Sequence, residues 1–210
     1  MNENLLEIGR VLRANTTGFA VGSRVKQLST PGFGSLVKAQ PVGEHEAIYG
    51  LIYNINIDDD QLIRRLVMVE DPRQEVIEDQ RNNRILPIEM SVLAIGYRLN
   101  GSLHYSLPPR PPLNLDPVIL VEDTEEIKQF TENLGYLRLI LRAEGGRVPV
   151  DQLLVAHMHD VYLRRGEDVE WVVSVVRELL ELLRSNYEVL IPTLEALCSA
   201  LPGLDLETSR

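Results

Sequence analysis

The chain has 210 residues, of which 44% are hydrophobic and 25% charged, with a formal net charge of −10 and a pI of about 4.9. This composition is typical of a globular protein with one large or two small domains, and it argues against disorder. Nucleic acids and anionic membranes attract basic surfaces, so the net acidity disfavours both as partners.

The acidic excess is concentrated toward the C-terminus. Residues 1–122 hold 12 Lys/Arg and 15 Asp/Glu, whereas residues 123–210 hold 9 and 16. The first residues, MNENLLEIGR, lack a basic segment followed by an apolar core, so we expect no signal peptide. No apolar run approaches the roughly 18 residues that cross a bilayer, and we expect a cytoplasmic protein. The single cysteine, Cys198, excludes an intrachain disulfide and a cysteine-based zinc cluster, and its apolar neighbours predict a buried, inert thiol.

Short alternating segments predict β-strands in the N-terminal half. The predicted strands cover residues 7–14, 19–21 and 24–28, then two strands within residues 33–57, and finally residues 85–97, 103–105 and 118–121. Gly34 opens the first strand of the central pair, and Gly50 lies inside the second. Asn100-Gly101 predicts a tight hairpin turn. Strands this short, with glycine at the bends, are typical of a small closed barrel.

Two segments interrupt this pattern. Residues 59–83 carry apolar residues at helical spacing after Asp58-Asp59-Asp60, which predicts a helical insertion between barrel strands. The run from Pro108 to Pro112 favours an extended backbone. We interpret it as a rigid connector between the barrel and the helices rather than as a ligand for an aromatic groove.

From Asp123 onward the sequence predicts helices. The first begins at Asp123 or Thr124 and ends at Gly145-Gly146, the second covers residues 151–165, and the third begins near Asp168. Pro192 predicts a break near residues 186–191, followed by a short fourth helix. The third helix has more Leu and Val than a small bundle buries, which favours a self-association face.

Together these elements predict an α+β fold. A small N-terminal closed β-barrel, residues 1–122 with the helical insertion near 59–83, precedes a C-terminal α-helical bundle, residues 123–210.

The barrel segment, residues 6 to 122, resembles the HAS-barrel shared by HerA-type DNA-translocating ATPases and F-type ATP synthase subunits. The resemblance rests on Ile8-Gly9-Arg10-Val11, on Gly34, Val37 and Lys38, on Gly50-Leu51-Ile52, and on Pro108 to Pro112 followed by Asp116-Pro117-Val118. In HerA-type proteins the barrel precedes a motor domain with a phosphate-binding loop, but no G-x-x-x-x-G-K-[ST] occurs in this chain. The resemblance therefore implies a barrel for assembly or partner docking without its own ATPase.

Candidate ligand sites are weak in the sequence. His157 and His159 are two residues apart on a predicted helix and point about 200° apart, so they cannot share a metal ion. Asp58-Asp59-Asp60 lacks the spaced ligands of a calcium loop, so we interpret it as a helix cap. No nucleophile motif is found, and we expect no cofactor. Five basic residues on one half of the barrel form a possible basic rim for nucleic acid or an acidic partner: Arg10, Arg13, Arg24, Lys26 and Lys38.

Three functional hypotheses follow. The preferred one is a non-enzymatic assembly or adaptor protein that binds a protein partner or itself through the barrel and the helical bundle. The first alternative is a nucleic-acid accessory factor that docks onto a separately encoded HerA-type motor. The second is a metal-dependent hydrolase whose site is assembled from residues distant in sequence.

Overall fold

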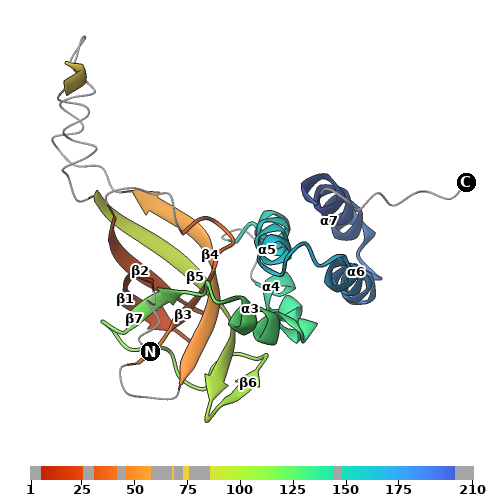
Figure 1. Ribbon diagram of the computed structural model, residues 1–210, viewed down its shortest axis with the longest axis horizontal. Coiled ribbons are helices and arrows are strands. Elements are labelled where there is room, and N and C mark those ends of the chain that lie inside the picture. Colours follow the sequence, from red (N-terminus) through yellow and green to blue (C-terminus); the bar gives the residue numbers. More distant parts are fainter. Residues whose placement is uncertain are drawn as a thin grey trace, which may run out of the picture.

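The computed structural model describes residues 6–25, 31–41, 46–57, 68, 73–75, 86–143 and 148–201. The chain forms a closed antiparallel β-barrel whose one side is covered by helices (Figure 1). This arrangement confirms the predicted α+β fold with an N-terminal barrel and C-terminal helices. The predicted helical insertion at 59–83, with the Asp58-Asp59-Asp60 cap, lies almost entirely outside the described residues.

Among the described residues six strands close the barrel, and a seventh, β6, pairs with β5 to form a hairpin. The strands are β1 Glu7–Asn15, β2 Gly18–Val25, β3 Leu36–Ala39, β4 Ala47–Ile57, β5 Leu86–Leu99, β6 Ser102–His104 and β7 Pro117–Leu120. Their order is β2-β1-β7-β3-β4-β5-β6, and antiparallel pairing of β2 with β5 completes the cylinder. The strand predicted at residues 19–21 and the start of the one predicted at 24–28 belong to a single strand, β2, which pairs with both β1 and β5.

Strands β4 and β5 are buried on both faces, and their successive side chains point alternately into the barrel and toward the helices. Ile48 and Ile52 of β4 point into the barrel with Met90 and Val92 of β5. The residues between them in β4, such as Tyr49, point outward against the helices. The barrel interior and the barrel–helix interface are therefore two separate apolar clusters that share the same strands.

The hairpin between β5 and β6 forms at the predicted Asn100-Gly101 turn. Asn100 has a φ of 51° and Gly101 a φ of 81°, which is the left-handed pair that a two-residue hairpin turn requires. The proline-rich segment follows this hairpin and leads into β7. It therefore connects two strands, and not the barrel to the helices as predicted.

The helices are α3 Thr124–Thr131, η1 Leu134–Tyr136, α4 Leu137–Leu141, α5 Val150–Arg164, α6 Val169–Leu183 and α7 Tyr187–Ala200. Asp123 caps α3 by accepting from the Glu126 amide, and Asp168 caps α6 in the same way from Trp171. The predicted continuous helix from residue 123 is instead α3, η1 and α4. The Asn133 side chain accepts from the Gly135 amide and so begins a new turn there.

Side chains from later in the chain support this interruption. Trp171 Nε1 donates to the Thr131 carbonyl over 2.9 Å, and Arg165 Nη1 donates to the Lys128 carbonyl over 3.4 Å. Two of the last four carbonyls of α3, those of Lys128 and Thr131, thus accept hydrogen bonds from side chains of later helices.

Pro192 lies inside α7, whereas the sequence predicts a break before it. The interruption occurs earlier, at residues 184–186, and α7 then continues through Pro192 to Ala200. Packing holds the helix together across the proline, because Leu190 and Leu197 on either side of it are buried.

The helices form layers over the barrel. Helices α3, α4 and α5 contact the barrel face made by β4 and β5, and α6 and α7 lie beyond them, farthest from the barrel (Figure 1). Trp171 and Leu197 of this outer layer belong to the same apolar cluster as Tyr49 and Leu51 of β4. Among the described residues no helix has both the length and the apolar character to traverse a bilayer.

Candidate protein-interaction surface

Helix α6 leaves some of its apolar surface uncovered. Its buried side chains include Trp171, Val175 and Leu179, which pack against the other helices. Val169 is 46% exposed, and Leu180 is 43% exposed. The apolar residues that form this stripe recur at i, i+4, i+7 and i+11: Val169, Val173, Val176 and Leu180. Such spacing places side chains on one side of a helix.

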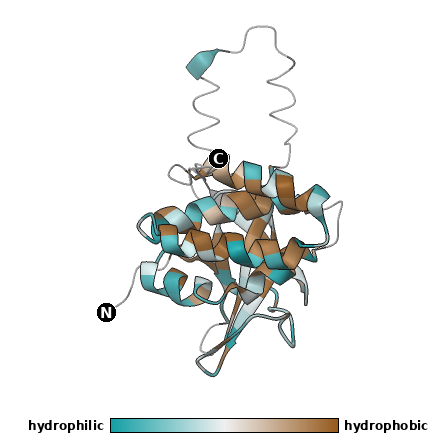
Figure 2. Cartoon of the chain, turned by 90° about the vertical axis from the view of Figure 1, so that its right-hand side faces the viewer, coloured by the Kyte–Doolittle hydropathy of each residue, from teal (hydrophilic) through white to brown (hydrophobic). Residues whose placement is uncertain are grey.

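Helix α7 repeats the same pattern. Tyr187 is 67% exposed and Ile191 50% exposed, although both are large apolar residues. The stripe on α7 has the same spacing as that on α6 and consists of Tyr187, Ile191, Leu194 and Cys198. We call the two sets together the outer stripes. Figure 2 views the molecule from this side and shows apolar segments along the outer helices.

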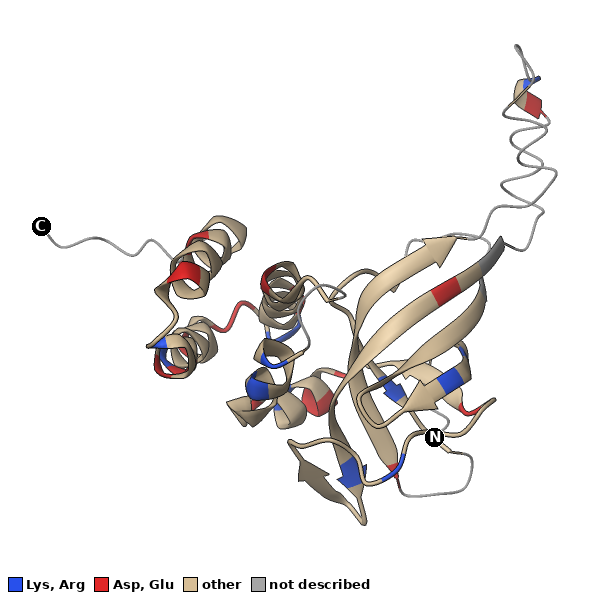
Figure 3. Ribbon diagram, turned by 180° about the vertical axis from the view of Figure 1, so that it is seen from behind, with Lys and Arg blue, Asp and Glu red and all other residues tan. Residues whose placement is uncertain are grey.

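Charged side chains border the outer stripes. Successive residues of an α-helix are rotated by about 100° around its axis. The residue directly after each stripe residue therefore lies beside the stripe, on the side away from the buried face. Exposed residues at these positions include Glu170 and Glu181 on α6, and Glu188 and Glu195 on α7. Within residues 168–201, the exposed cations of this layer are Arg177 and Arg184, and both signs of charge are visible in Figure 3. The border is therefore acidic overall, and wholly so on α7.

Cys198 lies on the α7 stripe. Its side chain is half-buried, and not fully buried as the sequence predicts. Because it is the single cysteine of the chain, a thiol reagent labels the protein at this surface.

Comparison with known proteins assigns no family. No protein-family model matches the chain, and no curated protein matches it.

Lys38 of the predicted basic rim lies in the barrel–helix interface. Its Nζ is 2.8 and 2.7 Å from the two carboxylate oxygens of Glu126 on α3, and its side chain is only 9% exposed. Tyr49 donates a 2.6 Å hydrogen bond to the same carboxylate. Burial, and secondly the Glu126 charge, raises the pKa of the Tyr49 hydroxyl, which keeps it protonated as the donor. This cluster joins α3 to the barrel.

Two other residues of the predicted rim, Arg10 and Arg13, form ion pairs of their own. Arg10 is exposed and pairs with Glu7 over 3.0 Å. Arg13 on β1 pairs with Glu89 on β5, over the intervening strand β2, and the hydrogen bond from Arg13 lowers the pKa of that carboxyl. Arg24 lies on β2, the placement of its side chain is not described, and Lys26 lies outside the described residues. Arg10, Arg13 and Lys38 therefore each have a carboxylate partner within the chain.

His157 and His159 lie in different surroundings, as their two-residue spacing on a helix predicts. His157 is buried beside Gly34 of the barrel and Tyr136 of η1, whereas His159 is half-buried and Asp160 pairs with Arg164 over 2.9 Å. Neither ring nitrogen of His157 has a hydrogen-bond partner, nor does the Tyr136 hydroxyl. Burial lowers the pKa of His157 to about 4, so the imidazole is neutral at pH 7. Within the described ranges, His, Cys, Asp and Glu side chains form no group of three suited to a metal ion.

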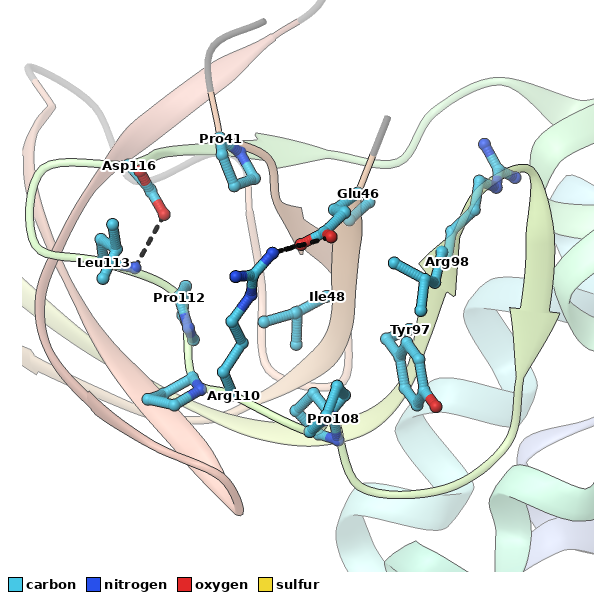
Figure 4. A pocket seen from close by; sticks show the side chains of 14 residues that line it. Pro41, Glu46, Ile48, Tyr97, Arg98, Pro108, Arg110, Pro112, Leu113 and Asp116 are labelled. Atoms are coloured by element: carbon cyan, nitrogen blue, oxygen red, sulfur yellow. Dashed lines mark hydrogen bonds and ion pairs between the residues drawn. The ribbon is translucent and has the colours of Figure 1, made fainter. Parts of the chain in front are cut away.

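A small pocket of about 140 Å³ lies between the proline-rich segment and the adjoining strands β4 and β5 (Figure 4). Ile48, Tyr97 and Pro108 supply apolar walls. Arg110 reaches across it to Glu46, with 2.8 Å to each carboxylate oxygen. Asp116 accepts from the Leu113 amide over 2.8 Å. The Arg110–Glu46 ion pair thus holds the proline-rich segment against the barrel. Arg110 and Glu46 bind each other, and Asp116 binds the backbone.

The outer stripes are the feature best suited to binding. They offer apolar area at the outer surface, next to charged groups that set orientation. The sequence identifies an apolar excess on the third helix, and the structure places Val173 and Leu180 from that excess on the surface. The α7 stripe is missed because the break expected near residues 186–191 includes its first two residues, Tyr187 and Ile191. The i, i+4, i+7, i+11 spacing of its residues is nevertheless readable in the sequence.

Proposed function

We propose that this protein is a cytoplasmic, non-enzymatic assembly or adaptor protein that binds a protein partner through the outer stripes. The observation that carries the proposal is the exposure of large apolar side chains at helical spacing on both α6 and α7. Scattered apolar residues are normal on protein surfaces, but aligned residues on adjacent helices are typical of an interaction site.

We further propose that the barrel is an HAS-like barrel used as a platform. A closed, six-stranded antiparallel barrel is compatible with this assignment. The barrel fixes the helices through the Lys38–Glu126 pair and the shared apolar cluster. In this proposal the barrel orients the outer stripes, and the stripes make the contact.

Chemical cross-linking in the protein's own cells tests the proposal, with the full chain compared to two matched variants. Val173→Glu and Ser174→Glu each add one carboxylate to the same turn of α6, the first on the stripe and the second beside it. We expect specific cross-linked partners for the wild type and Ser174→Glu, and their loss for Val173→Glu. Partners that persist equally in all three proteins would overturn the assignment of the outer stripes.

A further inference from the structure

The partner's chemistry can be narrowed from the spacing and charge of the outer stripes, an inference that rests on the proposed function. Each stripe is a line of apolar residues at i, i+4, i+7 and i+11. A helix with apolar residues at the same spacing is the complement of such a line, as in helix-in-groove recognition. We infer that the partner presents a basic amphipathic helix to α6 and α7.

The charge of the border argues for a basic helix. Four exposed carboxylates lie next to the stripes, at Glu170, Glu181, Glu188 and Glu195, against exposed guanidinium groups at Arg177 and Arg184. Lysine or arginine residues that flank the apolar face of an incoming helix meet these carboxylates at the rim of the contact. Rim pairs of this kind add modest affinity but raise the association rate and fix the orientation.

The same charge argues against a second copy of this chain as the occupant. Two copies facing each other through the stripes would bring Glu188 and Glu195 of one α7 toward an equally acidic surface. The net charge of −10 adds to that repulsion. The lysine or arginine residues of a basic helix would instead attract these carboxylates. They would be repelled only by Arg177 and Arg184.

Two model peptides of about 18 residues, roughly five helical turns, provide the test. One carries leucine at i, i+4, i+7 and i+11 with lysine elsewhere, and the other has the same leucines with glutamate elsewhere. A scrambled leucine–lysine peptide has the same charge without the apolar face. Binding to the full chain is measured by fluorescence anisotropy, and occupancy of the stripe by the rate at which a thiol reagent labels Cys198.

We expect the leucine–lysine peptide to bind, to slow the labelling of Cys198, and to bind at least about tenfold tighter than the other two peptides. Val173→Glu and Ile191→Glu should each weaken its binding about tenfold, although each adds negative charge that would strengthen unspecific attraction. Ser174→Glu should not weaken it. Glu188→Lys with Glu195→Lys should shift the preference toward the leucine–glutamate peptide.

The outcomes separate this inference from the proposed function. Equal binding of the lysine and glutamate peptides, or of the scrambled peptide, overturns the basic helix. No peptide binding, together with a dimer that Val173→Glu dissociates, overturns the basic helix in favour of a second copy and leaves the assembly role standing. Absence of peptide binding, self-association and cellular cross-links overturns both.

Discussion

Lys38 and Glu126 form an ion pair between the barrel and α3. Both groups are nearly buried, and Tyr49 donates a further hydrogen bond to the carboxylate. Replacing Lys38 removes the nearer of two cations beside this carboxylate, because Arg98 Nη1 lies 3.7 Å from Glu126. Removing one member of a buried ion pair costs several kcal/mol.

We expect Lys38→Met to lower the free energy of unfolding by about 3 kcal/mol, measured by urea titration with Trp171 fluorescence. The double variant Lys38→Met/Glu126→Gln should lose less than the sum of its single variants, because the carboxylate is removed together with its nearest cation. Arg13→Ala removes an exposed partner of Glu89 and serves as the control, with little change expected. A Lys38→Met protein as stable as the Arg13→Ala control would contradict the prediction.

His157 makes stability depend on pH. Its pKa is lowered to about 4 by burial, with Asp160 acting weakly in the opposite direction, against 6.5 in the unfolded chain. Between these two pH values His157 is protonated in the unfolded chain but neutral in the folded chain. The free energy of unfolding therefore decreases as the pH drops below about 6.5, and it stops decreasing below about 4. The difference corresponds to about 3 kcal/mol.

His157→Leu tests this dependence. The leucine variant should keep a nearly flat free energy of unfolding through this pH window after the carboxylate contribution, common to both proteins, is subtracted. An unchanged slope in the variant would assign the acid sensitivity to other groups.

At the scale of elements, α7 is where sequence and structure differ most. Pro192 has no amide hydrogen, and its ring crowds the carbonyl of Glu188 four residues earlier, so a helix break is the natural prediction. The break instead lies at residues 184–186, because the buried Leu190 and Leu197 hold both sides of the proline in one helix. Local rules predict the cost of the proline but not the packing that offsets it.

Pro192→Ala should therefore stabilise the protein. Pro192 is exposed, so the substitution removes no packed side chain, and it restores one hydrogen bond of α7. We expect a gain of at least about 1 kcal/mol in the free energy of unfolding, below the roughly 3 kcal/mol cost of proline in an unsupported helix. As a control, Ser199→Ala changes another exposed residue of α7 and removes only the hydrogen bond from its hydroxyl to the Glu195 carbonyl, leaving the N–H···O=C bonds of the helix in place. A loss of stability in Pro192→Ala would show that the proline is required for the geometry of α7.

The strands were predictable because their signals are local. Alternation marks β1, β4 and β5, and Asn100-Gly101 marks the hairpin with its two left-handed residues. The interruption between α3 and α4 was not predictable from periodicity, since it depends on Trp171 and Arg165 from later in the chain. The same limit applies to Lys38, whose partner Glu126 is 88 residues away.

At the scale of the whole molecule, the barrel and helices share one apolar cluster. It includes Tyr49 and Ile95 from the barrel and Phe130, Leu154 and Val175 from the helices. A division of the sequence at residue 122 describes the order of the elements but does not identify which of them pack together. A shared core of this kind favours a single unfolding transition.

Gly34 tests how tightly the barrel and the helices are coupled. Its φ is +85°, and a Cβ there would lie 2.7 Å from the Cβ of Ala156 and 2.9 Å from the amide nitrogen of His157 on α5. Gly34→Ala should therefore lower the free energy of unfolding by more than about 1 kcal/mol, through strain and a displaced α5. Gly32→Ala, where a Cβ meets nothing within 4 Å, should have little effect.

Hydrogen exchange measured separately on β4 and on α5 distinguishes a coupled barrel and helical layer from independent ones. If the shared cluster couples them, both elements should lose protection at the same denaturant concentration in the wild type, and Gly34→Ala should move both together. Helices that open in Gly34→Ala while β4 keeps its wild-type protection would mean that the barrel is stable alone. The barrel would then be a platform from which the outer stripes can detach, rather than one that holds them in a fixed orientation.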